Sequence, residues 1–316
     1  MKIILNDTDC NGISPSVATI GFFDGVHLGH RFLIRNLIET ASKEEGMTSM
    51  VITFDEHPRL VLHKEFQPRL LTTKEEKTIL LSKTGIDSCA MLHFDTDMAA
   101  LSAYDFMKSI LREKLNVRKL IIGYDNRFGH NREEGFDDYV RYGKELGIEV
   151  IKAEPFVLGG VNVSSSVVRA FLSEGEVEMA ERCLGYPYFV SGRVVSGFQE
   201  GRKMGFPTAN VEVNDNMKII PCPGVYAVKV RLEGTVGFKH GMMNIGTRPT
   251  FGDNNITLEV NIFNFEDDIY GQHIDVMFSH RLRKEQKFTS VGKLIEQLKE
   301  DRELAERLFE DDIDLQ

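Results

Sequence analysis

The segment at residues 19–30, Thr-Ile-Gly-Phe-Phe-Asp-Gly-Val-His-Leu-Gly-His, most constrains what this chain can fold into. It joins a short apolar run, residues 17–20, to an amphipathic pattern at residues 31–41. The run predicts a buried strand, and the pattern predicts a helix with one side facing a core. Because Gly21 and Gly25 permit sharp backbone turns, we expect a tight strand-to-helix connection.

His27 and His30 lie three residues apart where that helix should begin. Imidazoles at this spacing project to one side, near backbone N–H groups and the positive end of the helix dipole. Gly29 would let a ligand approach the main chain. A helix end of this kind binds anions, and the imidazoles can donate hydrogen bonds to phosphate oxygens. An isolated histidine is more often a packed or surface residue, but the pair among glycines favours a phosphate site.

Residues 21–30 in full, Gly-x-Phe-Asp-Gly-Val-His-x-Gly-His, resemble the FMN adenylyltransferase branch of the nucleotidylyltransferase superfamily, whose signature is His-x-Gly-His. The resemblance implies a binding site that includes Gly21, Phe23, Asp24 and Gly29. That chemistry needs no protein nucleophile, because a phosphate monoester can itself attack the α-phosphorus of ATP. The protein then has to align the reactants and stabilise charge while pyrophosphate leaves.

The length of 316 residues allows two domains, and a net charge of -10 argues against a broad nucleic-acid surface. No apolar run approaches the roughly 18 residues of a membrane span, so no membrane partner is expected. Residues 1–6 predict a first strand and no signal peptide, which favours a cytoplasmic protein. Four scattered cysteines predict reduced packing thiols, at Cys10, Cys89, Cys183 and Cys222. For the oligomeric state we expect a monomer or a weak homo-oligomer.

Up to residue 183, short apolar runs alternate with helical patterns. The runs that predict strands are residues 50–54, 88–92, 119–123 and 149–153. Thr72 or Thr73 can cap a helix, with a glutamate three residues later, and Gly147 ends another helix before a strand. This alternation predicts an α/β domain with a doubly wound parallel sheet, in which ligands bind beyond the carboxyl ends of the strands.

From residue 184 the pattern changes to strands joined by Gly, Pro, Asn and Asp turns. The predicted strands are residues 189–195, 224–232, 257–263 and 273–278. They favour a small antiparallel β-barrel, covered on one face by a terminal helix at residues 291–309. We therefore expect an α/β plus β chain, with domains at residues 1–183 and 184–316.

Two further segments are expected at the first site. Residues 123–129 follow a predicted strand and should lie at the same sheet edge as His27. In the resembled family this loop helps form the flavin and nucleotide pocket, which implies a binding role for Asp125. The family usually has an aromatic residue where this chain has Asn126. An Asx turn is an equally good interpretation of Asn126.

Residues 163–169, Val-Ser-Ser-Ser-Val-Val-Arg, place three hydroxyls before a predicted helix. One serine is expected to cap that helix. The segment resembles the Ser-Ser-Thr-x-x-Arg element of the family, which implies that Ser165, Ser166 and Arg169 contribute to the site. Arg169 lies about one turn further on and would add a fixed positive charge with planar donors for phosphate.

A second glycine-rich segment, residues 197–210, ends in Pro-Thr-Ala-Asn. It matches neither of the common phosphate-loop patterns, although its N–H groups could wrap a triphosphate. The Thr208 hydroxyl and the Asn210 amide oxygen are hard ligands that suit Mg²⁺. Taken alone, the segment is equally typical of a hairpin loop.

This segment resembles the Gly-Arg-x-x-Gly-Phe-Pro-Thr-Ala-Asn element of riboflavin kinases. Further matches to that family follow in order, at residues 223–226, 243–250, 258–265 and 282–288. The resemblance implies that Gly205, Pro207, Thr208 and Asn210 bind ATP with Mg²⁺. Riboflavin, FMN and ATP are then the expected small-molecule partners.

The resemblance also implies that Glu259 is the general base for the terminal ribityl hydroxyl as this oxygen attacks the γ-phosphate of ATP. A solvated glutamate is the commoner case, but Glu259 alternates with Leu258 and Val260 on its predicted strand. Arg283 would serve the flavin or the phosphates. Its alternative is a surface ion pair with Glu285 or Asp275.

Taken together, the resemblance implies a bifunctional riboflavin kinase/FAD synthetase that makes FMN in the barrel and FAD in the N-terminal domain. Two alternatives remain. Class I aminoacyl-tRNA synthetases also carry His-x-Gly-His, but they need a Lys-Met-Ser-Lys-Ser-like loop, and here Lys203 and Met204 are followed by Gly205. The barrel could instead be a flavin-binding regulatory module without catalysis, which an intact Glu259 argues against.

Overall fold

The computed structural model describes residues 1–5, 12–62, 67–124, 126–130, 133–197, 200–250 and 253–314. Contacts divide the chain into two compact units, residues 1–165 and 166–316. Helix α8 (Val177–Leu184) contacts a barrel strand, which is one reason why the second unit begins before residue 184. The expected domain boundary at residues 183/184 stays a prediction. Within the described ranges, no helix is both long and apolar enough to span a membrane.

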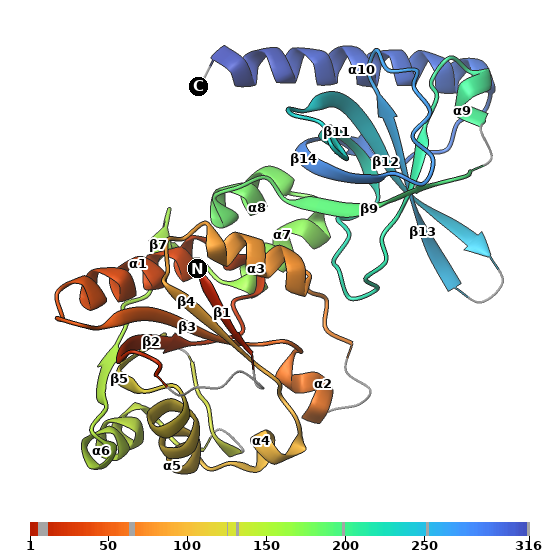
Figure 1. Cartoon of the computed structure of the whole chain (residues 1–316). Coiled ribbons are helices and arrows are strands. Elements are labelled where there is room, and N and C mark those ends of the chain that lie inside the picture. Colours follow the sequence, from red (N-terminus) through yellow and green to blue (C-terminus); the bar gives the residue numbers. More distant parts are fainter. Residues whose placement is uncertain are drawn as a thin grey trace. The chain divides into compact units, whose positions relative to one another are not determined.

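The first unit contains the predicted parallel sheet (Figure 1). Its six strands lie in the order β1 (Lys2–Leu5), β4 (Ser88–Leu92), β3 (Thr48–Phe54), β2 (Ser16–Ile20), β5 (Val117–Ile122) and β6 (Glu149–Lys152). Every neighbouring pair is parallel. All residues of β2 and β4 are buried, as expected for strands covered on both faces. Helices α1 (Leu28–Ser42) and α3 (Lys74–Ser82) cover one face, and α6 (Phe136–Leu146) covers the other (Figure 1).

The strand order reverses between β2 and β5. From β2 the chain adds β3 and β4 on one side, and it then returns to add β5 and β6 on the other. In open parallel sheets, ligands bind at such a switch point, beyond the carboxyl ends of the two strands. The turn that bears the histidines follows β2, and residues 123–129 follow β5.

Local signals set several helix ends of the first unit. Thr73 caps α3 and forms a reciprocal capping box with Glu76. Gly147, at φ 69°, ends α6 as expected. The remaining elements of this unit are η1 (Asp24–Val26), α2 (Pro58–Leu62), α4 (Thr96–Ala100), α5 (Ala103–Asp105), the π-helix η2 (Phe106–Lys114), and the hairpin β7 (Val157–Leu158) with β8 (Val161–Asn162).

The second unit contains the predicted antiparallel barrel, which is closed. Its strand order is β10 (Ala209–Glu212), β13 (Asp253–Ile262), β12 (Lys239–Thr250), β11 (Gly224–Leu232), β14 (His273–Lys284) and β9 (Phe189–Val195). The pattern did not predict β10 and β12, whose Gly, Pro and Asn residues are typical of turns. These strands form because pairing with their neighbours closes the barrel and leaves no open edge.

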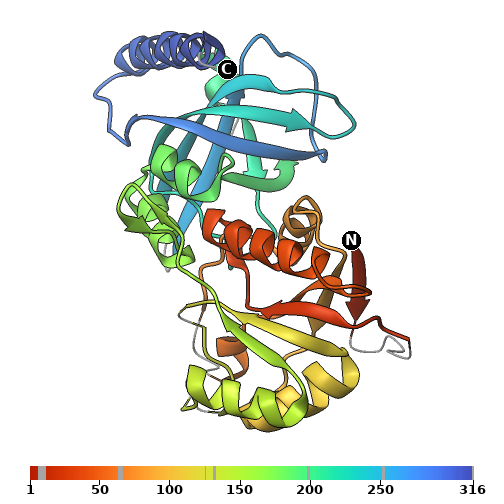
Figure 2. The same cartoon turned by 90° about the vertical axis from the view of Figure 1, so that its left-hand side faces the viewer.

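Helices α7 (Ser165–Glu174), α8 and the short α9 (Glu200–Lys203) accompany the barrel. The terminal helix α10 (Val291–Asp314) extends further than expected and contacts β11, β12 and β14 (Figure 2). Its Ala305 and Phe309 pack with Ala227 and Met242 in one buried cluster. Burial of this apolar side of α10 holds the helix on the outer face of the barrel.

Candidate active sites

The turn between β2 and α1 has an unusual backbone. Phe23, Gly25 and Val26 adopt positive φ values of 55°, 78° and 36°. Glycine adopts this conformation freely, but a β-branched residue such as Val26 is strained there. Such strain persists only where the surrounding structure holds the backbone in place.

Asp24 supplies one of the contacts that hold this turn. Its side chain is 3% exposed, and its carboxylate accepts hydrogen bonds from the backbone N–H groups of Leu71 (2.9 Å) and Thr72 (3.0 Å). The Thr72 hydroxyl also accepts the Gly25 N–H (3.1 Å), and the Asp24 carbonyl accepts the Ser165 hydroxyl (2.9 Å). The Asp24 carboxylate is therefore directed at the protein's own backbone, and its contact with a nucleotide stays a prediction.

The two histidine rings stack with centroids 3.6 Å apart. His27 caps α1, because its Nδ1 accepts the His30 backbone N–H (3.3 Å). A neutral His27 must then carry its proton on Nε2. The helix consequently begins at Leu28, three residues earlier than the apolar pattern predicted.

His30 is held neutral near pH 7. Burial lowers the pKa of His30 well below its ordinary value, and electrostatic interactions with His27 and Lys77 lower it further. Its Nδ1 is buried and has no hydrogen-bond partner within the described part of the chain. A neutral ring offers one N–H donor to a ligand.

The glycines of this segment are needed for packing. A Cβ on Gly29 would lie 2.9 Å from the Val163 carbonyl oxygen and 3.1 Å from the His27 ring. The absence of a side chain at Gly29 thus lets the Val163 backbone and the His27 ring pack closely against it. A Cβ on Gly21 would lie 3.1 Å from the Phe23 ring, which in turn packs 5.0 Å from the His30 ring. Direct ligand contacts of Gly21, Phe23 and Gly29 stay predictions.

The loop after β5 lies against the end of β2. The Asn126 side-chain amide donates a hydrogen bond to the carbonyl of Ile20, the last residue of β2. Asn126 therefore ties the two sides of the switch point together, in place of the ring that the resembled family usually has there. Asp125 lies outside the described residues.

Helix α7 begins earlier than its hydroxyl pattern suggested. Ser165 and Ser166 stand in its first turn rather than before it. Ser166 is exposed and Arg169 is half-buried. Both belong to the second unit, whereas His27 belongs to the first, so their contribution to the histidine site stays a prediction.

In the barrel, one cross-strand row contains three of the predicted residues. Arg283 lies opposite Val225, Val225 opposite Asn244, Asn244 opposite Glu259, and Glu259 opposite Asn210. Directly opposite residues of antiparallel strands share a face. The sequence did not single out Asn244, and the only signal for it was its place in the motif at residues 243–250.

Two glycines bring the chain close to the expected metal ligands. A Cβ on Gly197 would lie 2.1 Å from the Asn210 side-chain nitrogen, and one on Gly201 would lie 3.2 Å from the Thr208 hydroxyl. Gly205 adopts a left-handed φ of 82° with open space around it. The glycine spacing of this segment thus serves chain packing around Thr208 and Asn210.

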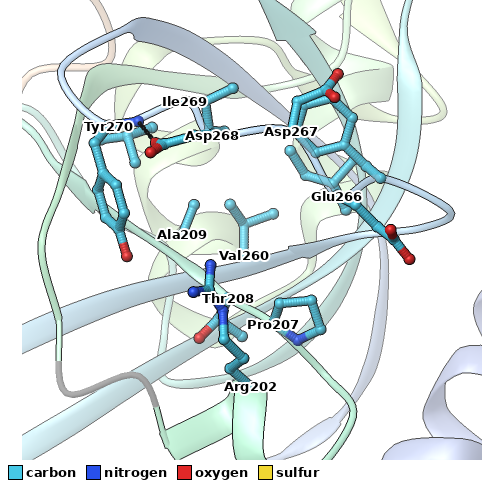
Figure 3. A pocket seen from close by; sticks show the side chains of 13 residues that line it. Arg202, Pro207, Thr208, Ala209, Val260, Glu266, Asp267, Asp268, Ile269 and Tyr270 are labelled. Carbon is cyan, nitrogen blue, oxygen red and sulfur yellow. Dashed lines mark hydrogen bonds between the residues drawn. The ribbon is translucent and has the colours of Figure 1, made fainter.

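A cavity of about 460 Å³ opens beside Thr208 (Figure 3). Arg202, Pro207 and Thr208 form one side, and acidic residues from 266–268 lie across the opening (Figure 3). Apolar side chains, including that of Val260, line the part between them. Because Glu259 precedes Val260 on β13, its side chain points to the opposite face of that strand.

Arg283 pairs with neither of the residues named as its surface alternatives. Its guanidinium donates to both carboxylate oxygens of Asp301 on α10, at 2.8 to 3.1 Å. Asp275 instead pairs with Arg231. The alternative interpretation of Arg283, a surface ion pair with Glu285 or Asp275, is therefore wrong, because docking of α10 brings a carboxylate from 18 residues away. A role of Arg283 toward the flavin or the phosphates stays a prediction.

Comparisons with known proteins match both halves of the chain. The FAD synthetase family model matches residues 11–167, and the riboflavin kinase family model matches residues 184–309. The bifunctional riboflavin kinase/FMN adenylyltransferase of Escherichia coli (strain K12) is 39% identical over 293 residues, which cover 93% of this chain and 92% of the relative. The protein of the same name from Bacillus subtilis (strain 168) is 36% identical, over 94% of this chain and 93% of its own.

Among solved structures, one titled as a macrolide-efflux protein from Streptococcus pneumoniae superposes with a TM-score of 0.87 at 31% identity. The match covers 97% of this chain and 99% of that one. The activity in that title belongs to that protein. Both matching family models describe flavin-nucleotide enzymes instead.

Proposed function

Because this chain belongs to the family of bifunctional riboflavin kinases/FMN adenylyltransferases, we propose that each half holds one of the family's two active sites. The enzyme phosphorylates riboflavin to FMN with ATP, and it transfers AMP from a second ATP to FMN, giving FAD and pyrophosphate. We assign AMP transfer to residues 1–183 and riboflavin phosphorylation to residues 184–316. The observation that best supports the assignment of AMP transfer is the stacked pair of His27 and His30 rings at the switch point.

In AMP transfer, a phosphate oxygen of FMN attacks the α-phosphorus of ATP, and the bond to the pyrophosphate oxygen breaks. The His27 Nε2–H and the N–H of neutral His30 donate to the α-phosphate oxygens, where negative charge increases in the transition state. Their place at the start of α1 adds the favourable helix dipole. Ser165, Ser166 and Arg169 contribute further donors to the phosphates.

In riboflavin phosphorylation, Glu259 accepts the proton of the terminal ribityl hydroxyl. That oxygen attacks the γ-phosphorus of ATP, and ADP leaves. The cavity beside Thr208 receives the adenine nucleotide, and its phosphates extend past Thr208 to the face of β13 that carries Glu259. Support comes from the register, which places Glu259 on the same face as Asn210 and in line with Arg283.

The kinase half also uses Mg²⁺. Thr208 and Asn210 fit this ion, because hydroxyl and amide oxygens are hard ligands and Mg²⁺ takes few protein ligands. Bound there, Mg²⁺ would neutralise charge on the ATP phosphates. Removal of divalent metal with a chelator should stop FMN formation, and added Mg²⁺ should restore it. FMN formation at the full rate in excess chelator would contradict this role.

A pair of variants tests the two sites separately. His30→Ala should lower FAD formation from FMN by roughly 100-fold or more, because a transition-state donor is lost, and it should spare FMN formation. Glu259→Gln should lower FMN formation by a similar factor and spare FAD formation. Loss of both activities in either folded variant would refute the assignment of one site to each half.

We further infer that the enzyme's partners are these small molecules, with neither nucleic acid nor a membrane among them. The net charge of -10 supports this, because phosphate-backbone binding needs clustered positive charge. We propose a cytoplasmic monomer or weak homo-oligomer. Sedimentation analysis over a range of concentrations would reveal a stable higher oligomer if one exists.

A further inference from the structure

Lys77 is a buried cation that the reactions above do not use. Its side chain is 2% exposed. The Nζ donates hydrogen bonds to the Phe22 carbonyl (3.2 Å), the Thr53 hydroxyl (3.3 Å) and the Phe54 carbonyl (2.8 Å). An ammonium group has three protons, so these acceptors use its full donor capacity. A lysine is almost never buried this deeply unless such partners are present.

The acceptors lie at the carboxyl ends of two neighbouring strands. Phe54 is the last residue of β3, and Phe22 lies two residues after the end of β2. The Thr53 hydroxyl also donates to the Phe22 carbonyl (3.1 Å). The ammonium therefore joins β3 to the first residues of the strained turn, at the point where the chain leaves the sheet toward His27.

Residues 71–77 hold this turn at two points. Lys77 holds Phe22 through its ammonium, and the N–H groups of Leu71 and Thr72 hold the Asp24 carboxylate. Helix α3, which carries Lys77, is itself fixed by its capping box. The positive φ values within the turn are costly, so they depend on anchors of this kind.

We propose that Lys77 is a positioning residue for AMP transfer, whose ammonium fixes the turn that presents His27 and His30 to the α-phosphate. The proposal rests on the function proposed above for the first unit. Lys77 acts through the Phe22 carbonyl and the turn, and it needs no contact with a substrate. Misplacement of catalytic groups by about 1 Å can cost roughly 100-fold in rate, so the anchor matters for catalysis as well as for folding.

The charge of Lys77 makes a pH-dependent test possible, because a purely structural role of this side chain would not make the rate of FAD formation depend on its protonation. Burial lowers the pKa of Lys77 to about 8, although the charge of Asp24 raises this pKa in part. The ammonium should therefore lose a proton just above neutral pH, and a neutral amine cannot satisfy all three acceptors. The titratable groups that face Lys77 are Asp24, Cys89, Asp55, Lys74 and His30.

The pH dependence of the free energy of unfolding separates this loss of activity from unfolding. The folded pKa of Lys77 lies below its ordinary value of 10.5, so between about pH 8 and 10.5 the unfolded chain binds more protons than the folded one. In that range this group makes the folded state more stable as pH rises. A fall in FAD formation above pH 8 then cannot come from unfolding linked to Lys77.

The test compares Lys77→Met with Lys83→Met, which removes an exposed charge next to the end of the same helix. FAD and FMN formation are assayed separately at saturating substrates from pH 6.5 to 9.5, with melting followed by circular dichroism. Lys77→Met should lower kcat for FAD formation by roughly 100-fold and leave FMN formation unchanged. Lys83→Met should match the wild type. The wild-type FAD rate should fall through about pH 8 while its FMN rate does not.

If Lys77→Met does not fold, Thr53→Val removes one acceptor at constant size and should lower FAD formation in the same direction. A folded Lys77→Met that forms FAD at the wild-type rate would overturn the proposal, as would a wild-type FAD rate that does not fall between pH 7 and 9. His30→Ala distinguishes failure of the positioning role of Lys77 from failure of the proposed histidine site. If His30→Ala is inactive and Lys77→Met fully active, only the positioning role fails; if both are fully active, the proposed site itself fails.

Discussion

The Arg283 guanidinium on β14 forms a bidentate ion pair with the Asp301 carboxylate on α10. The Asp301 side chain is 3% exposed, and it also accepts a hydrogen bond from Gln297 (3.1 Å). Because Arg283 lies in the same cross-strand row as Glu259, this pair connects the terminal helix to the proposed kinase site. Docking of α10 is therefore part of how the site is built.

Asp301→Ala should destabilise the barrel and slow the kinase. Removing one partner of a buried ion pair costs about 3 kcal/mol, because the other charge stays desolvated. We expect the free energy of unfolding of the barrel to fall by about that amount, with a loss of FMN formation and unchanged FAD formation. Chemical denaturation and the two assays measure this. Glu300→Ala, an exposed neighbour on α10, is the matched control. Equal effects of both substitutions would argue against the pair.

Gly197→Ala should impair the kinase through Asn210. The added methyl group would meet the Asn210 amide nitrogen at 2.1 Å, so this side chain must move. We predict a several-fold higher KM for MgATP in FMN formation, with no change in FAD formation. Gly292→Ala adds a methyl group on α10 where the nearest heavy atom lies 3.9 Å away, and it serves as the control. An unchanged KM in Gly197→Ala would show that MgATP binding does not depend on the present position of the Asn210 side chain.

Asp24→Asn should weaken the turn that bears the histidines. Oδ1 of Asp24 accepts the N–H groups of both Leu71 and Thr72, and Oδ2 also accepts that of Leu71. An amide nitrogen at either position would therefore face at least the Leu71 N–H, and this clash between buried donors costs about 2 kcal/mol. We expect lower stability of the first unit and slower FAD formation, while FMN formation persists. Asp97→Asn, on an exposed position of α4, is the control. Wild-type stability in Asp24→Asn would contradict the anchoring role.

His280→Gln should reduce the stability of the second unit in a pH-dependent way. The hydrogen bond to Glu178 raises the pKa of His280, and the charge of Asp312 adds to this against the effect of burial. A raised folded pKa favours the protonated folded state, so the stabilisation is full below the unfolded value of about 6.5 and disappears as pH rises through the folded pKa.

Denaturation of wild type and His280→Gln at pH 5.5 and 8.5 checks this sign. The difference in unfolding free energy should be larger at pH 5.5. His273→Gln, which replaces an exposed histidine on the same strand, should show no such difference between the two pH values. A larger destabilisation by His280→Gln at pH 8.5 than at pH 5.5 would contradict a raised pKa of His280 in the folded state.

Short-range patterns predicted many elements of the fold correctly. Strand β4 has the predicted ends, and the Thr73 cap and the Gly147 stop are both present. The predicted α/β plus β architecture is confirmed. Strands β10 and β12 were missed because their composition is that of turns, and they exist through pairing with strands distant in the chain.

In the candidate sites, too, local patterns predicted some features, and contacts between distant residues decided the others. Spacing alone identified His27 and His30 as neighbours on a helix end, but it did not indicate that His27 caps that helix. Nor did it indicate Lys77, whose acceptor Phe22 lies 55 residues away, or the pairing of Arg283 with a residue of α10.

The sequence by itself determined the element types, the two-part architecture and the motif residues, because each of these depends on neighbours within a few positions or on a family pattern. Only the tertiary structure decided which buried charges meet. Asp24, Lys77 and Asp301 find their partners through packing of segments far apart in the chain, and that packing depends on the whole core.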